Sequence, residues 1–250
     1  MTDTIKTYLT KIQIGAEQSY KNLSIFPLVA DYYIPFDYRT LDDALSKDLI
    51  EVLEIRQKNS TPMYKVTNKS DQMILIHEGE KLVKAEGQRN VGNSIMIPAQ
   101  ETVVVPARLI EKNRWSLNSN PTRCFEKVKK SQDYLEHFAS VDSQVGALFV
   151  INGKVVGMDC FGKPDILEKI FMKILESYAQ DAAGKFDPKM HLKSSKAEAI
   201  HFLQMAKGAR VRTKGPAKLG TGCRLESKMC SGFALAHENN ILSLSVMAKN

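Results

Sequence analysis

The hydrophobic pattern changes near Trp115 and divides the chain into two parts. Before this residue, short runs rich in β-branched and aromatic side chains alternate with polar turns, a pattern typical of antiparallel strands in a sandwich or a barrel-like sheet. No segment of helix length separates the later runs, so parallel βαβ units are not expected among them. The predicted strands of this part are 5–14, 23–30, 50–55, 63–67, 72–76, 94–97 and 102–105.

Two local signals refine this β-rich part. Pro27 has no backbone N–H to donate, so we expect it at a sheet edge or at a bulge. Thr40 can cap a short helix over 41–46, and Asp43 three residues later completes a weak capping box.

After Trp115 the pattern predicts an α+β part. Asn152 and Gly153 lie between two apolar runs, which is a strong signal for a hairpin. Pro164 can open a long helix that ends before Gly184. The predicted elements are a helix over 124–139, the hairpin, helices over 164–183 and 195–207, and strands over 233–237 and 241–246.

Length and composition indicate an ordinary globular protein of the α+β class. The chain has 250 residues and is 43% hydrophobic and 25% charged, which is enough for a sizeable core. No long linker interrupts it, so we expect one composite domain over 1–250, β-rich over 1–115 and α+β over 116–250. No apolar run approaches the roughly 20 residues of a membrane span. The N-terminus has no signal-peptide pattern, and the four scattered cysteines indicate a reduced, cytoplasmic protein.

The chain carries a formal net charge of +7, with a basic segment over Lys207–Lys218. A basic excess can attract phosphates or nucleic acid, but it is also typical of a solvated surface. The segment has no interleaved aromatic residues of the kind that stack on bases. Nucleic acid is therefore a disfavoured partner that the sequence leaves open, and the pattern indicates no particular oligomeric state.

The segment between Glu78 and Trp115 is the best candidate for a site. It threads polar side chains between two very apolar runs, and such groups must either reach water or converge on a ligand. Planar donors dominate the segment and could hold a phosphate, a carboxylate or a base. The candidate ligand-binding residues are Gln88, Arg89, Asn90, Arg108, Glu111 and Arg114. An internal network in which these arginines pair with glutamates would use the same residues, and both interpretations stay open.

Three acids are candidates for acid–base chemistry. Glu78 and Glu80 lie two residues apart, which on a strand would place both carboxylates on one face. Asp159 lies at the expected exit of a strand, just before the helix that begins at Pro164. Two solvated acids beside Gly79 would explain the same pair without chemistry.

Several familiar motifs are disfavoured. The stretch from Gly87 to Ser94 nearly spells a phosphate-binding loop, but Asn93 replaces its lysine and Pro98 closes a strand-like run where a helix should follow. The spacing of cysteines and histidines matches no standard zinc site, so no metal ligands are assigned. Cys160 is expected to be a buried, inert thiol.

The chain resembles the domain family named for its association with ADP-ribosylglycohydrolases and rhodanese-phosphatases. The matching segments are 41–45, 52–55, 66–69, 74–82, 88–90, 97–98, 105–106, 111–115, 144–146 and 159–161. The resemblance implies a link to ADP-ribose or related nucleotide metabolism through gene association. In this chain Glu86 and Gly87 precede Gln88, where the family often has a small residue with Lys or Gln.

Two functions follow as hypotheses. The first is a cytoplasmic domain that binds a small phosphorylated, nucleotide-like ligand, with hydrolytic or transfer chemistry as an open question. The second is a non-catalytic interaction or scaffold protein whose arginines and glutamates pair with one another.

Overall fold

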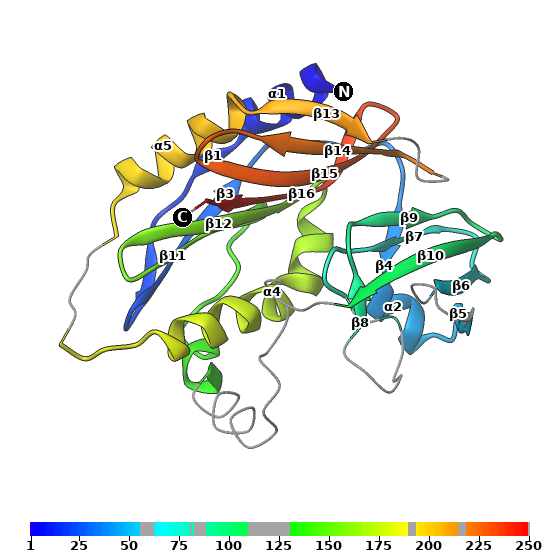
Figure 1. Cartoon of the computed structure of the whole chain (residues 1–250), viewed down its shortest axis with the longest axis horizontal. Coiled ribbons are helices and arrows are strands. Elements are labelled where there is room, and N and C mark those ends of the chain that lie inside the picture. Colours follow the sequence, from blue (N-terminus) through cyan, green and yellow to red (C-terminus); the bar gives the residue numbers. More distant parts are fainter. Residues whose placement is uncertain are drawn as a thin grey trace.

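The computed structural model describes residues 1–55, 63–80, 82, 89–109, 131–189, 194–214 and 219–249. They form an α+β fold in which a large sheet lies between helices and a smaller β-rich unit lies beside it (Figure 1). The α+β class expected from the sequence is confirmed.

The large sheet is antiparallel and joins strands from both ends of the chain. Its order is β1-β3-β11-β12-β16-β15-β14-β13, and β2 pairs with β3. The strands are β1 (Gln13–Ile14), β2 (Gln18–Tyr20), β3 (Leu23–Val29), β11 (Gln144–Ile151), β12 (Lys154–Phe161), β13 (Arg210–Lys214), β14 (Thr221–Glu226), β15 (Cys230–His237) and β16 (Asn240–Ala248).

Helices cover both faces of this sheet. Helix α4 (Pro164–Gly184) packs on one face, against β11 and β12. Helices α1 (Thr2–Lys11) and α5 (Lys196–Lys207) lie on the other face (Figure 1). Alternation along β12 matches this arrangement, because Cys160 joins the core with α1 and α5 while Phe161 joins the core with α4.

The prediction of a strand over 5–14 was wrong, because most of this segment is helix α1. The buried residues of the segment are Ile5, Tyr8, Leu9 and Ile12, at most 5% exposed. Their spacing of three, one and three residues places them on one face of a helix. The β-branched and aromatic composition suggested a strand, but the period of the buried positions decides the structure.

Pro27 lies at a break in sheet pairing, as expected. The outer side of β3 pairs first with β1 and then with β2, and the carbonyl of Pro27 accepts a bond from Gly15 N between them, at 2.8 Å. In a strand, the N–H and the C=O of one residue point to the same side. The missing N–H of Pro27 would therefore point into the gap between β1 and β2, where no partner strand would accept its hydrogen bond.

The hairpin of β11 and β12 turns at Asn152 and Gly153, as predicted. Both residues have positive φ, 51° and 71°, as a type I′ turn requires. Both hairpin strands run to the lengths that the apolar pattern indicates.

The small β unit, as we call the described residues between 38 and 109, contains two short sheets. One has the order β4-β7-β9 and the other β5-β6-β10-β8. A shared core lies between them, so the sandwich expectation holds for this unit, and its described strands close no barrel. The elements are β4 (Tyr38–Thr40), α2 (Leu41–Ser46), β5 (Ile50–Ile55), β6 (Met63–Asn68), β7 (Met73–Ile76), β8 (Arg89–Val91), β9 (Ile95–Ile97) and β10 (Thr102–Leu109).

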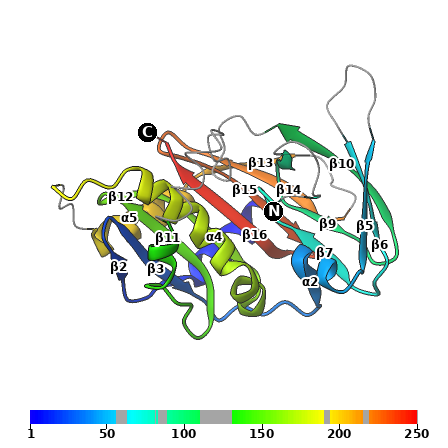
Figure 2. The same cartoon turned by 90° about the horizontal axis from the view of Figure 1, so that it is seen from below.

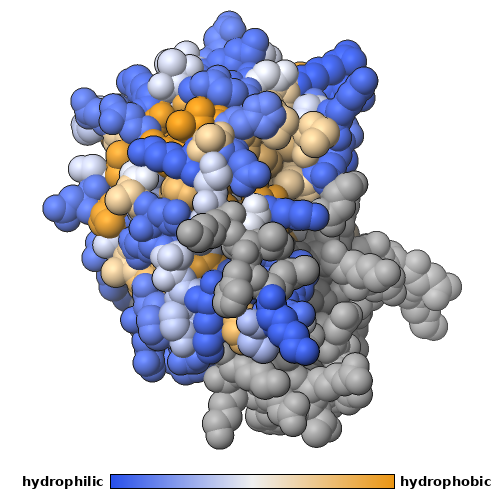
Figure 3. All heavy atoms as spheres, turned by 90° about the vertical axis from the view of Figure 1, so that its left-hand side faces the viewer, coloured by the Kyte–Doolittle hydropathy of each residue, from blue (hydrophilic) through white to orange (hydrophobic). Residues whose placement is uncertain are grey.

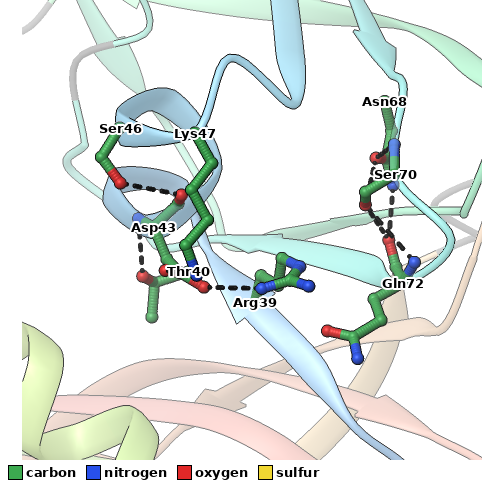
Figure 4. Close-up of polar contacts among 8 residues, drawn as sticks. All are labelled: Arg39, Thr40, Asp43, Ser46, Lys47, Asn68, Ser70 and Gln72. Atoms are coloured by element: carbon green, nitrogen blue, oxygen red, sulfur yellow. Dashed lines mark hydrogen bonds and ion pairs between the residues drawn. The ribbon is translucent and has the colours of Figure 1, made fainter.

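Buried polar turns hold this unit together (Figure 4). The Asn68 amide, 1% exposed, donates to the carbonyls of Gln72 and Pro98, both at 2.8 Å. Its oxygen accepts from the backbone N–H and the hydroxyl of Ser70, at 2.9 and 2.7 Å. This network ties the turn between β6 and β7 to the end of β9. Thr40 caps α2 as predicted, because its hydroxyl accepts from Asp43 N at 3.2 Å.

Other expectations have mixed outcomes. Ser195 caps α5 through Ala197 N, as the sequence indicated. Of the helix expected over 124–139, the described part is helical over 131–135. Strands β2, β4, β8, β13 and β14 were not predicted.

The surface is mainly hydrophilic on the side at the left of Figure 1, with scattered apolar residues between the polar ones (Figure 3). Among the described helices, none combines the length and the apolar character that crossing a membrane requires.

Candidate functional site

The candidate site begins at the turn His77–Glu80, directly after β7. Glu80 N donates to the carbonyl of His77 at 3.1 Å, and Gly79 has a φ of 90°, a conformation that favours glycine. The two glutamates therefore lie on a tight turn, and the expectation of a shared strand face was wrong. Glu78 is half-buried, whereas Glu80 is 3% exposed.

Both carboxylate oxygens of Glu80 have partners. Oε2 accepts from the backbone N–H of His77 at 2.7 Å, and Oε1 accepts from the Lys173 ammonium at 2.8 Å. Burial raises the pKa of Glu80, and the neighbouring Lys173 charge and the His77 N–H offset part of this rise. The carboxylate therefore binds the turn to helix α4.

Lys173 also bonds a second acid. Its ammonium lies 2.5 Å from Asp42 in α2, whose N-terminus is fixed by the Thr40 cap (Figure 4). Burial alone would lower the pKa of Lys173, but the charges of Glu80 and Asp42 outweigh it and raise the pKa. One lysine thus joins three elements: the turn, α4 and α2.

A second contact holds the turn from the side of β9. The Ser94 hydroxyl accepts from Glu78 N at 3.0 Å and lies 3.1 Å from Nδ1 of His77. The His77 ring packs beside Phe161 of the large sheet, with 5.0 Å between ring centroids. His77 and Ser94 are buried, so this pair acts within the fold.

Lys173, Asp42 and Ser94 were not predicted as partners of this turn. A signal for Lys173 exists, because it follows Ile166 and Ile170 at helical spacing and so places a lysine on the apolar face of α4. A cation at such a position indicates a buried acid on a neighbouring element. Nothing in the sequence shows which acid that is.

The strand pairing brings together the backbones of three predicted ligand-binding residues. Arg89 pairs with Leu109, and Asn90 pairs with Arg108, across β8 and β10. The end of β8 also pairs with the turn, since Val91 N donates to the carbonyl of Glu80 at 3.0 Å. Gln88, Glu111 and Arg114 lie outside the described residues. After β8 the chain continues through Ser94 into strand β9, where a phosphate-binding loop would require a helix.

Asp159 lies apart from this group. It is fully buried inside β12, because that strand continues to Phe161, and the expectation of a strand exit was wrong. Its Oδ1 accepts from the Ser245 hydroxyl at 2.5 Å and its Oδ2 from the Tyr178 hydroxyl at 3.0 Å. Its carboxylate therefore braces α4 against the large sheet.

The described cysteines are free thiols within the core. Cys160 is buried, as expected, and burial, followed by the Asp159 charge, raises the pKa of its thiol. Within the described ranges, no cluster of His, Cys, Asp and Glu is placed to hold a metal ion.

A hollow of about 240 Å³ lies at the start of α4. It is lined by the segment 32–37, which leads toward β4, and by Lys163 and Pro164. Asp37 and Lys163 form an ion pair at its edge. Of the predicted site residues whose side chains the structure describes, Glu78, Glu80 and Asp159, none lines this hollow.

Comparisons with known proteins give one match. The sequence profile of the ARG and Rhodanese-Phosphatase-superfamily-associated Protein domain matches residues 11–127 and 119–247. No curated protein and no solved structure matches the chain.

Proposed function

Because the chain belongs to the ARG and Rhodanese-Phosphatase-superfamily-associated Protein domain family, we propose that it binds a small phosphorylated, nucleotide-like ligand related to ADP-ribose. The proposed site is the β8–β10 pair next to the His77–Glu80 turn. Association with a family does not by itself define an activity, so the proposal depends on the local geometry.

The register of β8 and β10 is the observation that carries the proposal. It pairs Asn90 directly with Arg108, so these two positions share one face of the sheet, while Arg89, the preceding residue of β8, has a position on the other face. Arginine suits phosphate because its planar guanidinium can donate two parallel hydrogen bonds. In the proposed complex Arg108 holds an anionic group beside Asn90, which orients the ligand. Arg89, Gln88 and Arg114 contact the part of the ligand that extends past β8, the edge strand of this sheet.

The three candidate acids have different roles in this proposal. Glu80 and Asp159 use both carboxylate oxygens within the fold, so we assign them to holding the turn and the sheet. Glu78 is half-buried on the turn beside β8. A hydrolytic or transfer step, if the ligand undergoes one, would use Glu78 as its acid–base group.

Thermal shift and calorimetric titration with ADP-ribose and AMP test the proposal. A ligand at about 100 times its dissociation constant should add about 2.7 kcal/mol to stability. The double variant R89A/R108A should lose this shift. The control K65A removes an exposed charge from β6, which pairs with β10, and should retain it. Absence of a shift with either ligand, or equal binding by R89A/R108A, contradicts the proposal.

The scaffold hypothesis is the second candidate, favoured by the fully occupied Glu80 carboxylate. In that case Arg89 also pairs internally with a buried acid. R89A would then lower the free energy of unfolding substantially, and neither ligand would stabilise the wild type. The same two measurements therefore separate the candidates.

The cellular compartment belongs to the proposal as well. The thiols of Cys160, Cys223 and Cys230 are free, which agrees with a reducing environment. We therefore place the proposed function in the cytoplasm.

A further inference from the structure

A row of directly opposed residues crosses the large sheet on the face that carries α4. Arg212 pairs with Arg224, Arg224 with Phe233, and Phe233 with Ser245. Directly opposed residues of antiparallel strands lie on the same face. Ser245 bonds Asp159 beneath α4, which fixes the face on which the row lies.

The outer end of this row is basic and exposed. Arg210, Arg212 and Arg224 are all exposed, and the Arg224 side chain retains 62% of its accessible surface. Their neighbours in the strands point to the opposite face, where Val211 and Leu225 pack against the core with α1 and α5. Helix α4 packs on β11 and β12, which β16 and β15 separate from β14 and β13 in the sheet (Figure 2).

The pairing of two arginines is unfavourable for the fold. Like charges directly opposite each other on a sheet destabilise it. Glu226 offsets part of this charge, because it lies 3.9 Å from Arg224 and 3.3 Å from Lys249. The pKa of Glu226 is lowered by Lys249 first and then by Arg224 and Arg212, so all three cations act at this point.

The aromatic residue that the basic segment lacks in sequence is supplied by another strand. Phe233 of β15 lies directly opposite Arg224 and is partly exposed. Strands are separated by about 4.8 Å, so Arg212, Arg224 and Phe233 span roughly 10 Å across three strands. Phe233 packs partly against the core with α4, and the exposed part of its ring, next to the guanidinium groups, can stack on a base while the cations hold the adjoining phosphates.

We propose that the face formed by Arg210, Arg212, Arg224 and Phe233 binds single-stranded nucleic acid. The arginines contact successive phosphates, and the Phe233 ring stacks on one base. This surface is separate from the proposed β8–β10 site and does not depend on it.

Fluorescence anisotropy with a labelled oligothymidylate of about 20 nucleotides tests this surface. R212A/R224A should bind about tenfold or more weakly, and its log–log salt slope should fall by about 1.4, at about 0.7 per lost phosphate contact. The control K6A/K196A removes two exposed charges from α1 and α5, on the opposite face, and should bind as the wild type does. R89A should also leave this affinity unchanged.

The stacking part has its own test. F233L keeps an apolar side chain but removes the ring, and it should bind about fivefold or more weakly. An abasic oligonucleotide of the same length and charge should bind the wild type more weakly by a similar factor, which covers the case that F233L does not fold. Failure of the wild type to bind, an equal loss in R212A/R224A and K6A/K196A, or equal affinity for abasic and intact strands would overturn the proposal.

Discussion

Helix α4 holds two buried carboxylates in different ways. At its contact with the small β unit, Glu80 is balanced by the ammonium of Lys173, which retains 34% of its accessible surface. On the large sheet, Asp159 accepts from the hydroxyls of Tyr178 and Ser245, both buried. In the first region the partner of the buried carboxylate is a cation that is still partly exposed to water. In the second region the partners are neutral hydroxyl groups inside the core.

The difference indicates how firmly each region is joined. A buried charge without a partner is costly, so Lys173 is needed for Glu80 even though their attraction is largely offset by desolvation. Asp159 is held instead by two hydroxyl donors, which satisfy its oxygens with hydrogen bonds and add no second charge to the core. We therefore expect the contact with the small β unit to respond to charge substitutions and pH, and the interior of the large sheet to respond mainly to lost hydrogen bonds.

The largest effect should come from Lys173→Met, which leaves Glu80 buried without its cation. We expect a loss of about 3 kcal/mol in the free energy of unfolding, measured by urea denaturation at neutral pH. K173M/E80Q should recover most of this loss, because no charge then stays buried. Lys169→Met, an exposed position on the same helix, is the control. An equal loss in the single and double variants would show that the pair does not couple.

Asp159→Asn should have the next largest effect. It removes the charge that strengthens two hydrogen bonds, so we expect a loss of about 2 kcal/mol, and Tyr178→Phe should lose about 1 kcal/mol. Asp142→Asn, on an exposed turn, is the control for the change of charge. If D159N unfolds at the same urea concentration as the wild type, the carboxylate does not brace α4.

The pH dependence should separate the two regions further. Burial raises the pKa of Glu80 above its ordinary value of 4.5. A group with a raised folded pKa contributes stability that is fully present below the unfolded pKa and is lost as the pH rises through the folded pKa. The stability of the wild type relative to E80Q should therefore fall as the pH rises above about 4.5. Lys47 lowers the pKa of Asp43, so the contribution of Asp43 to stability has the opposite pH dependence. This contribution is the same in the wild type and in E80Q, and it cancels when the two proteins are compared. Urea titrations across this range measure the difference, and a constant value contradicts the expectation.

The smallest effect should come from Asp42→Asn. Asp42 is the second partner of Lys173, but its side chain is 55% exposed and well screened by water. We expect a loss of about 0.5 kcal/mol or less. A loss as large as that of K173M would mean that Asp42, not Glu80, is the main partner of the lysine.

Much of the fold follows from local sequence patterns. Strands β5, β6, β7, β9 and β10, the Asn152-Gly153 hairpin, the long helix at Pro164 and the Thr40 cap were predicted because each has a short-range signal. The first helix was missed because its composition resembles a strand. Strands β13 and β14 were missed because arginines and a glycine mask their alternation, which appears only once Leu225 is known to be buried and Val211 to pack against the same core.

The candidate site was harder to predict because its contacts are long-range. The sequence identified Glu80, but its partner Lys173 is distant in the chain and on another element. Asp159 was grouped with Glu80 on chemistry, although the two contact different parts of α4. The roles proposed for Gln88, Arg89, Asn90, Arg108, Glu111 and Arg114 stay predictions, as does the single composite domain.

The route of the chain through the large sheet has a consequence for biosynthesis. Strand β3 pairs directly with β11, although the whole small β unit lies between them in sequence. During translation β3 leaves the ribosome long before β11 is made, so the hydrogen bonds between these two strands can form only later. The small β unit between them has its own core and can fold first. Its folding shortens the flexible chain between β3 and β11 and so lowers the entropic cost of pairing them.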